Sequence, residues 1–129
     1  MDMDILRILL VEDDYPLRKL VCEALELMGH QVTTAVDGRD AIARLQDCPF
    51  EAVCTDAAMP NGVLGMEVCQ YVTSRCPQTG LVLTSGFPRS ALGELPGRVV
   101  FLAKPYRVTD LLAAIDNARL LTRTPSAHG

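Results

Sequence analysis

Polar side chains that could do chemistry follow four short apolar runs in this 129-residue sequence. They are the carboxylates Glu12, Asp13, Asp14 and Asp56, the hydroxyls of Thr84 and Ser85, and the ammonium of Lys104. Carboxylates that crowd together repel one another unless a cation lies between them. Mg²⁺ prefers oxygen ligands and is often held by a few carboxylates and a phosphate, and a lysine can hold a phosphate oxygen. These residue types indicate magnesium-assisted phosphate chemistry if the fold brings them together.

The hydrophobic pattern predicts the elements that would position these side chains. Short apolar runs predict strands at residues 5–11, 31–36, 50–55, 81–84 and 98–103. Apolar residues at helical spacing predict helices at 17–28, 41–45, 65–76 and from residue 108 onward. Five such βα repeats imply an α/β, doubly wound parallel sheet with helices on both faces. Ligands of such sheets bind beyond the carboxyl ends of the strands, which is where the polar residues stand.

The segment between the last two predicted strands, residues 87–97, is poorly suited to a helix. Pro88 can begin a helix, but Pro96 cannot continue one and disfavours helical geometry in the residue before it. Gly93 costs about 1 kcal/mol relative to alanine in a helix interior. We therefore predict a short, weak or irregular fourth helix that is more mobile than its neighbours.

Some of the polar residues have ordinary structural explanations. Asp14 stands two residues before Pro16, and aspartate is a favoured N-cap, so Asp14 is better explained as the cap of the first helix. Ser85 alone would be a turn residue, and Lys104 alone a surface lysine. Glu12 and Asp13 are harder to explain as caps, which favours them as cation ligands.

Four motifs in this order resemble the receiver domains of response regulators in two-component signalling. They are the acidic cluster at residues 12–14, Asp-x-x-Met-Pro from Asp56, Thr-Ser-Gly from Thr84 and Lys-Pro from Lys104. The resemblance covers residues 4–119. It implies a flavodoxin-like sheet with the strand order 2-1-3-4-5. We expect one domain at residues 1–121 and a flexible, polar tail at 122–129.

The resemblance implies a role for each polar residue. Asp56 resembles the phosphoacceptor, Ser85 the hydroxyl that bonds the phosphoryl group (with Thr84 as second choice), and Lys104 the lysine that pairs with a phosphoryl oxygen. The implied Mg²⁺ ligands are Asp13, Asp56 and the backbone carbonyl of Ala58, with Glu12 holding the ion through a water molecule. Ser85 is also implied to be a switch position, together with two further residues. Phe101 matches the family's switching aromatic, although it lacks a hydroxyl, and Pro105 matches its cis-proline.

The implied function is that of a signalling switch rather than an enzyme, because the domain would catalyse only its own phosphorylation and dephosphorylation. The phosphoryl group would come from a histidine kinase or a histidine phosphotransfer protein. A downstream protein would bind the fourth helix, the fifth strand and the last helix. The chain would be either a single-domain regulator or the receiver of a hybrid histidine kinase.

Three other functions fit parts of this pattern less well. An Asp-nucleophile phosphatase of the haloacid-dehalogenase kind resembles this chain in fold class, but it would place a second aspartate at position 58, where this chain has Ala58. A flavodoxin-like cofactor binder would need a loop rich in Ser, Thr or Gly at residues 12–14, where carboxylates repel phosphate. A pseudo-receiver that only binds partners would not need the complete set of carboxylates, hydroxyl and lysine.

Composition limits the partners and the cellular location that we expect for this protein. The net charge of -4 and the absence of tryptophan argue against direct nucleic-acid binding. Neither a secretory signal nor an apolar run of about 20 residues is present, so we expect a cytoplasmic protein that does not bind membranes. The five cysteines form no C-x-x-C pair, which argues against zinc and for small apolar side chains in a reducing compartment.

Overall fold

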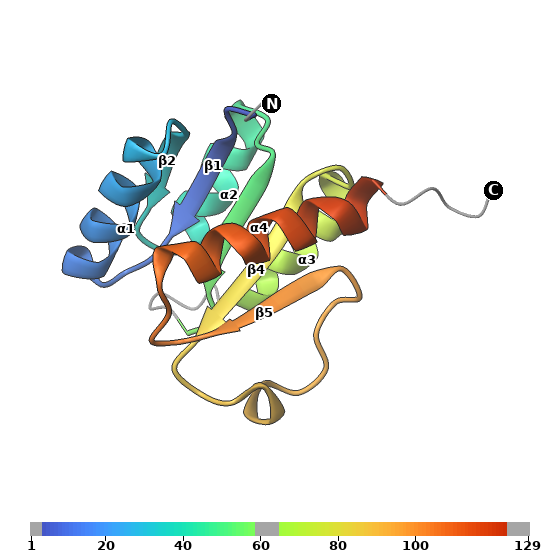
Figure 1. Ribbon diagram of the computed structural model, residues 1–129. Coiled ribbons are helices and arrows are strands. Elements are labelled where there is room, and N and C mark those ends of the chain that lie inside the picture. Colours follow the sequence, from blue (N-terminus) through green and yellow to red (C-terminus); the bar gives the residue numbers. More distant parts are fainter. Residues whose placement is uncertain (1–3, 59–64, 124–129) are drawn as a thin grey trace.

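A parallel sheet forms the centre of the computed structural model, which describes residues 4–58 and 65–123 (Figure 1). The elements in chain order are β1 (Arg7–Val11), α1 (Tyr15–Leu27), β2 (Gln31–Ala35), α2 (Gly38–Asp47), β3 (Ala52–Asp56), α3 (Gly65–Arg75), β4 (Gly80–Ser85), the 3-10 turn η1 (Arg89–Leu92), β5 (Val99–Ala103) and α4 (Val108–Arg123). Within the described residues the sheet has five strands in the order β2-β1-β3-β4-β5. The predicted doubly wound fold and its strand order are therefore confirmed.

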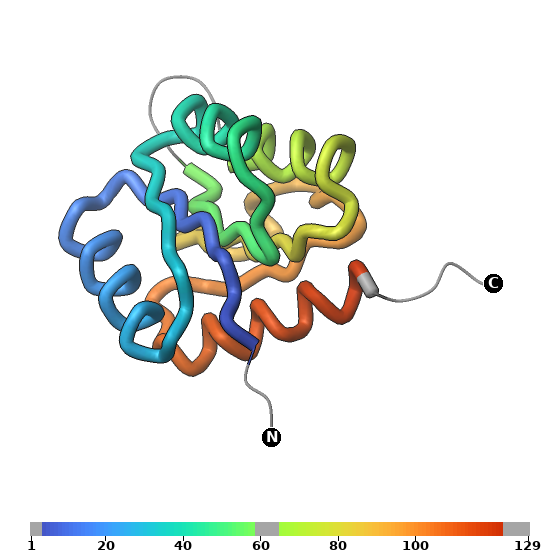
Figure 2. Tube along the Cα trace, turned by 90° about the horizontal axis from the view of Figure 1, so that it is seen from above, coloured from blue at the N-terminus to red at the C-terminus, as the bar shows by residue number. Residues whose placement is uncertain are grey.

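Two apolar cores lie on opposite faces of the sheet. Figure 2 shows α2 and α3 on one face and α1 and α4 on the other. Successive residues of β1 point to alternate faces, so that Leu9 packs toward α2 and α3, while Ile8 packs toward α1 and α4. Because both faces are covered, β3 and β4 are buried along their whole length. This burial explains why they read in the sequence as continuous apolar runs.

Short polar residues begin the helices that stand beside the carboxyl edge of the sheet. Asp14 caps α1, since its Oδ2 accepts a hydrogen bond from the backbone N–H of Leu17 at 3.1 Å, and Pro16 lies in the first turn. The cap predicted for Asp14 is thereby confirmed. Asp37 caps α2 in the same way, accepting from the N–H of Asp40 at 2.8 Å.

Gly65 lets α3 begin directly against the end of β3. A Cβ atom at position 65 would lie 2.0 Å from the backbone oxygen of Asp56 and 2.8 Å from the Cα of Ala57. The Gly65 N–H also donates to the carbonyl of Ala57 at 3.1 Å. Real Cβ atoms do not approach backbone atoms so closely, so only glycine fits here. The start of α3 thus fixes the backbone of Asp56.

The segment between β4 and β5 has little helix, as predicted. Only the four residues of η1 are helical, and Gly93 follows them with a φ of 73°. Leu92 and Leu95 pack against the core on the α2–α3 side. In Figure 1 the segment runs as an extended loop beside β5. The greater mobility expected of this segment stays a prediction.

Some boundaries differ from the predicted ones. The strand β1 begins at Arg7 rather than at residue 5, and β3 begins at Ala52 rather than at residue 50. The helix α4 continues to Arg123, past the domain end expected at residue 121. The rest of the expected tail, residues 124–129, lies outside the described residues. In the described part of the chain, no helix is long and apolar enough to cross a membrane.

Candidate functional site

The strand register brings the polar residues to one edge of the sheet. Val11 at the end of β1 pairs with Thr55 of β3, so Glu12 and Asp56 follow on neighbouring strands. Asp56 pairs in turn with Thr84, and Ser85 pairs with Ala103, directly before Lys104. Because parallel strands all end at the same edge, residues far apart in sequence become neighbours there.

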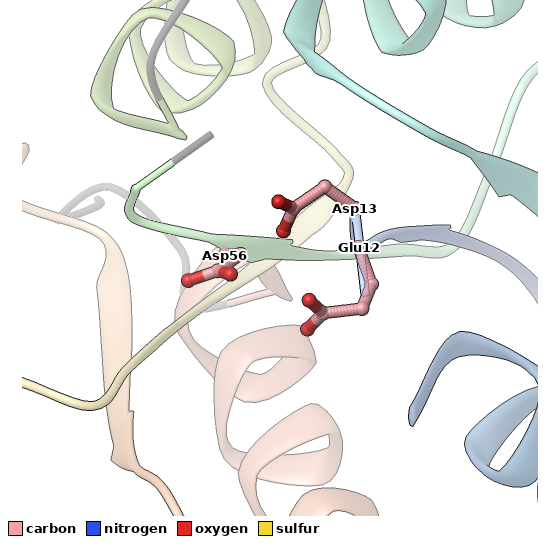
Figure 3. Close-up of side chains that lie close together, drawn as sticks. All are labelled: Glu12, Asp13 and Asp56. Atoms are coloured by element: carbon pink, nitrogen blue, oxygen red, sulfur yellow. The ribbon is translucent and has the colours of Figure 1, made fainter. Parts of the chain in front are cut away.

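Three carboxylates converge at this edge. One oxygen each from Glu12, Asp13 and Asp56 lies within 4.8 Å of the others (Figure 3). Glu12 and Asp56 are only 3% and 8% exposed, while Asp13 is open to solvent. Hard oxygen ligands with an exposed side fit Mg²⁺, which keeps part of its water. In the described residues no other group of three acidic, histidine or cysteine side chains is placed to hold a metal ion.

Lys104 lies between two of these carboxylates. Its Nζ donates to Oε1 of Glu12 at 2.9 Å and to Oδ2 of Asp56 at 3.1 Å. Burial acts to lower the pKa of Lys104, but its bonds to Glu12 and Asp56 outweigh burial and raise that pKa, so the ammonium stays charged. For Glu12 burial is the larger effect, and its pKa is raised despite the bond from Lys104.

The two hydroxyls at the end of β4 have different surroundings. Thr84 donates from Oγ1 to the carbonyl of Thr55 at 3.4 Å, a contact within the sheet. The Oγ of Ser85 instead accepts the N–H of Phe87 at 2.9 Å, which leaves the hydroxyl proton of Ser85 to be donated to a ligand. This geometry favours Ser85 over Thr84 as the hydroxyl that serves the site.

Asp14 is directed away from the carboxylate cluster. Its carboxylate caps α1, and its backbone N–H donates to Oε2 of Glu12 at 3.2 Å. The structure thus brings Glu12 and Asp13, but not Asp14, to the cluster with Asp56. Ala58 donates its N–H to Oδ1 of Asp56 at 3.4 Å. The role of its carbonyl as a metal ligand stays a prediction.

Two of the three expected switch positions lie on β5 and directly after Lys104. The Lys104–Pro105 peptide bond is cis, as expected from the motif. Phe101 is half-buried on the edge strand β5, where its neighbours Val100 and Leu102 pack toward α4. Its role in switching stays a prediction.

Two residues near the site were not singled out from the sequence. Arg18 bonds the backbone carbonyls of Glu12 and Asp13, yet an arginine in an amphipathic helix reads as an ordinary surface charge. Tyr106 lines an apolar hollow of about 410 Å³ together with Leu17, Gly86, Lys104 and Pro105. Burial is the main cause of the raised pKa of Tyr106. The sequence signal that could have drawn attention to Tyr106 is its position two residues after Lys104.

The chain matches a known protein family. The profile of the response regulator receiver domain matches residues 8–116, most of the chain. The chain belongs to the response regulator receiver family. The receiver protein CpdR of Brucella abortus (strain 2308) is 35% identical over 113 residues, which is 85% of this receiver and 93% of CpdR.

Two solved structures share the fold of this receiver. The chemotaxis protein CheY4 of Vibrio cholerae has a TM-score of 0.75 at 25% identity, covering 89% of this chain and 99% of CheY4. The response regulator TrrA of Thermotoga maritima, solved in complex with Mg(2+)-BeF, has a TM-score of 0.76 at 24% identity. That match covers 87% of this receiver and 97% of TrrA.

The different surroundings of Asp13 and Asp14 lead to a test. We expect Asp13→Asn to weaken Mg²⁺ binding by about tenfold or more, because a charged oxygen ligand is lost from the cluster. Asp14→Asn should leave binding within about twofold, since asparagine is an equally good N-cap. Titration calorimetry with MgCl₂ measures both constants. A larger loss from Asp14→Asn would show that Asp14, rather than Asp13, serves the metal.

Proposed function

We propose that this receiver accepts a phosphoryl group on Asp56 and thereby switches its partner-binding face. The donor is the phosphohistidine of a histidine kinase or of a histidine phosphotransfer protein, and Mg²⁺ assists. The observation that carries the proposal is the surroundings of Asp56. It ends a central strand next to Glu12 and Asp13, and the ammonium of Lys104 contacts it.

The reaction requires little covalent chemistry from the protein. An oxygen of Asp56 attacks phosphorus, the P–N bond to the donor imidazole breaks, and an acyl phosphate forms. The transition state is loose and highly charged, so catalysis comes from positioning and electrostatics. Mg²⁺ held by Glu12, Asp13, Asp56 and the Ala58 carbonyl would neutralise charge on the phosphoryl oxygens.

Lys104 and Ser85 would convert the modification into a conformational change. The phosphoryl group brings about two negative charges. Lys104 then leaves the carboxylate of Asp56 for a phosphoryl oxygen, and the Ser85 hydroxyl donates to another. Each charge-assisted hydrogen bond contributes about 1.5–3 kcal/mol. Two of them approach the roughly 5.5 kcal/mol that reverses a 1:99 equilibrium.

The output surface of the proposed switch is the region of residues 87–97, β5 and α4. Ser85 is the link to it, because its Oγ now accepts the N–H of Phe87. When Ser85 turns to the phosphoryl group, that contact is lost, and half-buried Phe101 turns inward. A downstream protein binds the rearranged face. The short turn η1 takes the place of the fourth helix that the resemblance implied for this surface.

The surroundings of Asp56 also bear on the alternative phosphatase function. A phosphatase of the haloacid-dehalogenase kind needs a general acid at position 58, and the methyl side chain of Ala58 cannot act as one. The receiver therefore catalyses only its own phosphorylation and dephosphorylation. It acts in the cytoplasm, as a single-domain regulator or as part of a hybrid histidine kinase. TrrA, which shares this fold, was solved in complex with Mg(2+)-BeF, in keeping with the proposed magnesium site.

Phosphorylation by a small donor tests the proposal. Incubation with acetyl phosphate and Mg²⁺ should add the mass of one phosphoryl group, in a form that survives acid and is released by hydroxylamine. Asp56→Asn should abolish the addition, because an amide is not a nucleophile here, whereas Asp14→Asn should be labelled like the parent. Intact-protein mass spectrometry measures the labelling. Equal labelling of Asp56→Asn and the parent would contradict the assignment.

Hydrogen exchange tests the output side of the switch. Residues 87–97 contain one four-residue turn and should exchange fast in the free receiver. Beryllofluoride with Mg²⁺ should slow exchange there as the segment orders. The buried positions of α4 between residues 111 and 118 serve as the internal control and should be protected in both states. Strong protection of 87–97 already in the free receiver, unchanged on activation, would rule out this output mechanism.

A further inference from the structure

Arg18 of α1 holds the backbone from which two of the three clustered carboxylates project. Its Nη1 donates to the carbonyl oxygen of Glu12 at 2.8 Å and to that of Asp13 at 3.3 Å. These two residues follow β1 and precede the cap of α1, so they belong to neither element. One guanidinium thus ties the loop back to the helix that follows it.

We propose that Arg18 is a positioning residue for magnesium binding. By fixing the peptide carbonyls of Glu12 and Asp13, it keeps both carboxylates turned toward Asp56. The inference rests on the proposed magnesium-dependent function and adds a residue that never touches the ion. Groups that orient metal ligands in this way typically contribute about 10–100-fold to metal affinity.

The guanidinium of Arg18 is itself held in place. Its Cζ lies 5.4 Å from the centre of the Tyr15 ring, one helical turn earlier in α1. Arginine over an aromatic face is an attractive arrangement, and residues three apart on a helix are neighbours. The side chain is half-buried, so its fork is less free than that of an exposed arginine. Tyr15, Arg18 and the 12–13 backbone therefore form one connected support.

The charge of Arg18 acts in the opposite direction to its hydrogen bonds. A cation close to the site repels Mg²⁺, so removing the charge alone would strengthen binding. Charge repulsion through solvent is screened by salt, whereas the two hydrogen bonds act directly on the backbone of the ligand residues. We expect the loss of the hydrogen bonds to dominate. The sign of the change in Mg²⁺ affinity separates the two effects.

Two substitutions of Arg18 separate the effect of its charge from the effect of its hydrogen bonds. Arg18→Lys keeps the charge but ends short of the two carbonyls, and Arg18→Gln removes both the charge and the reach. We expect about 10–100-fold weaker Mg²⁺ binding for Arg18→Gln and a smaller but clear loss for Arg18→Lys. At saturating Mg²⁺, phosphorylation by acetyl phosphate should approach the parental rate in both. A general loss of structure would not give such a split.

Arg75 provides a matched control. It lies 5.4 Å from the ring of Tyr71 on α3, an equivalent stacking pair away from the carboxylates. Arg75→Gln should leave Mg²⁺ affinity unchanged. Thermal unfolding in EDTA shows whether each variant is folded, and Arg18→Lys carries the test if Arg18→Gln is not.

The outcomes distinguish this inference from the proposed function. If the parent receiver binds no Mg²⁺, the proposed function itself fails. If the parent binds Mg²⁺ and Arg18→Lys binds within twofold of it, the positioning role is wrong. Tighter binding by Arg18→Gln would show that repulsion, not positioning, is the main effect of Arg18. Weaker binding by both variants, with Arg75→Gln unchanged, is the result that the inference requires.

Discussion

Glu12 and Asp56 are buried carboxylates at the carboxyl edge of the sheet, and Lys104 bonds to both. A buried charge is costly unless it is paired, so the ammonium of Lys104 makes the ionised cluster tolerable in the absence of a metal. The same contact makes the site responsive. In the proposed function, a phosphoryl group brings more negative charge than a carboxylate and would compete for Lys104. The rest of the structure keeps these groups within reach of one another.

The fold keeps these groups together through the register of its strands and through the close approach of α3 to the end of β3. The pairing of β1, β3, β4 and β5 places the carboxylates, the hydroxyl and the lysine on adjacent strand ends, although they are up to 92 residues apart. Gly65 allows α3 to start against the backbone of Asp56. Each face of the sheet is closed by its own pair of helices, and the described residues near the site that lie outside helices and strands form its loops. The segment after β4 is the least regular of these in the described part of the chain.

Much of this could be predicted from the sequence, because the signals are local. Apolar runs predicted the strands, and the position of Asp14 before Pro16 predicted a helix cap. The short, irregular fourth helix was predicted from Pro88, Gly93 and Pro96. The site residues followed from their positions after strands and from the resemblance to receivers. The contact of Arg18 with the 12–13 carbonyls could not be predicted, since it depends on the path of a loop that no periodicity describes. The extension of α4 to Arg123 could not be predicted either. Thr122 begins a polar stretch in the sequence, but the helix includes the first two residues of that stretch.

The central claim is that Asp56 itself carries the phosphoryl group, and chemical trapping tests it most directly. Borohydride reduces the acyl carbon of an acyl phosphate to an alcohol and releases the phosphate, so a phosphorylated aspartate is converted to homoserine. After incubation with acetyl phosphate and Mg²⁺, peptide mass spectrometry should find homoserine at position 56 alone, and not in samples that contain EDTA. Homoserine at Asp13 or Asp14, or phosphate retained on Ser85, would contradict the account.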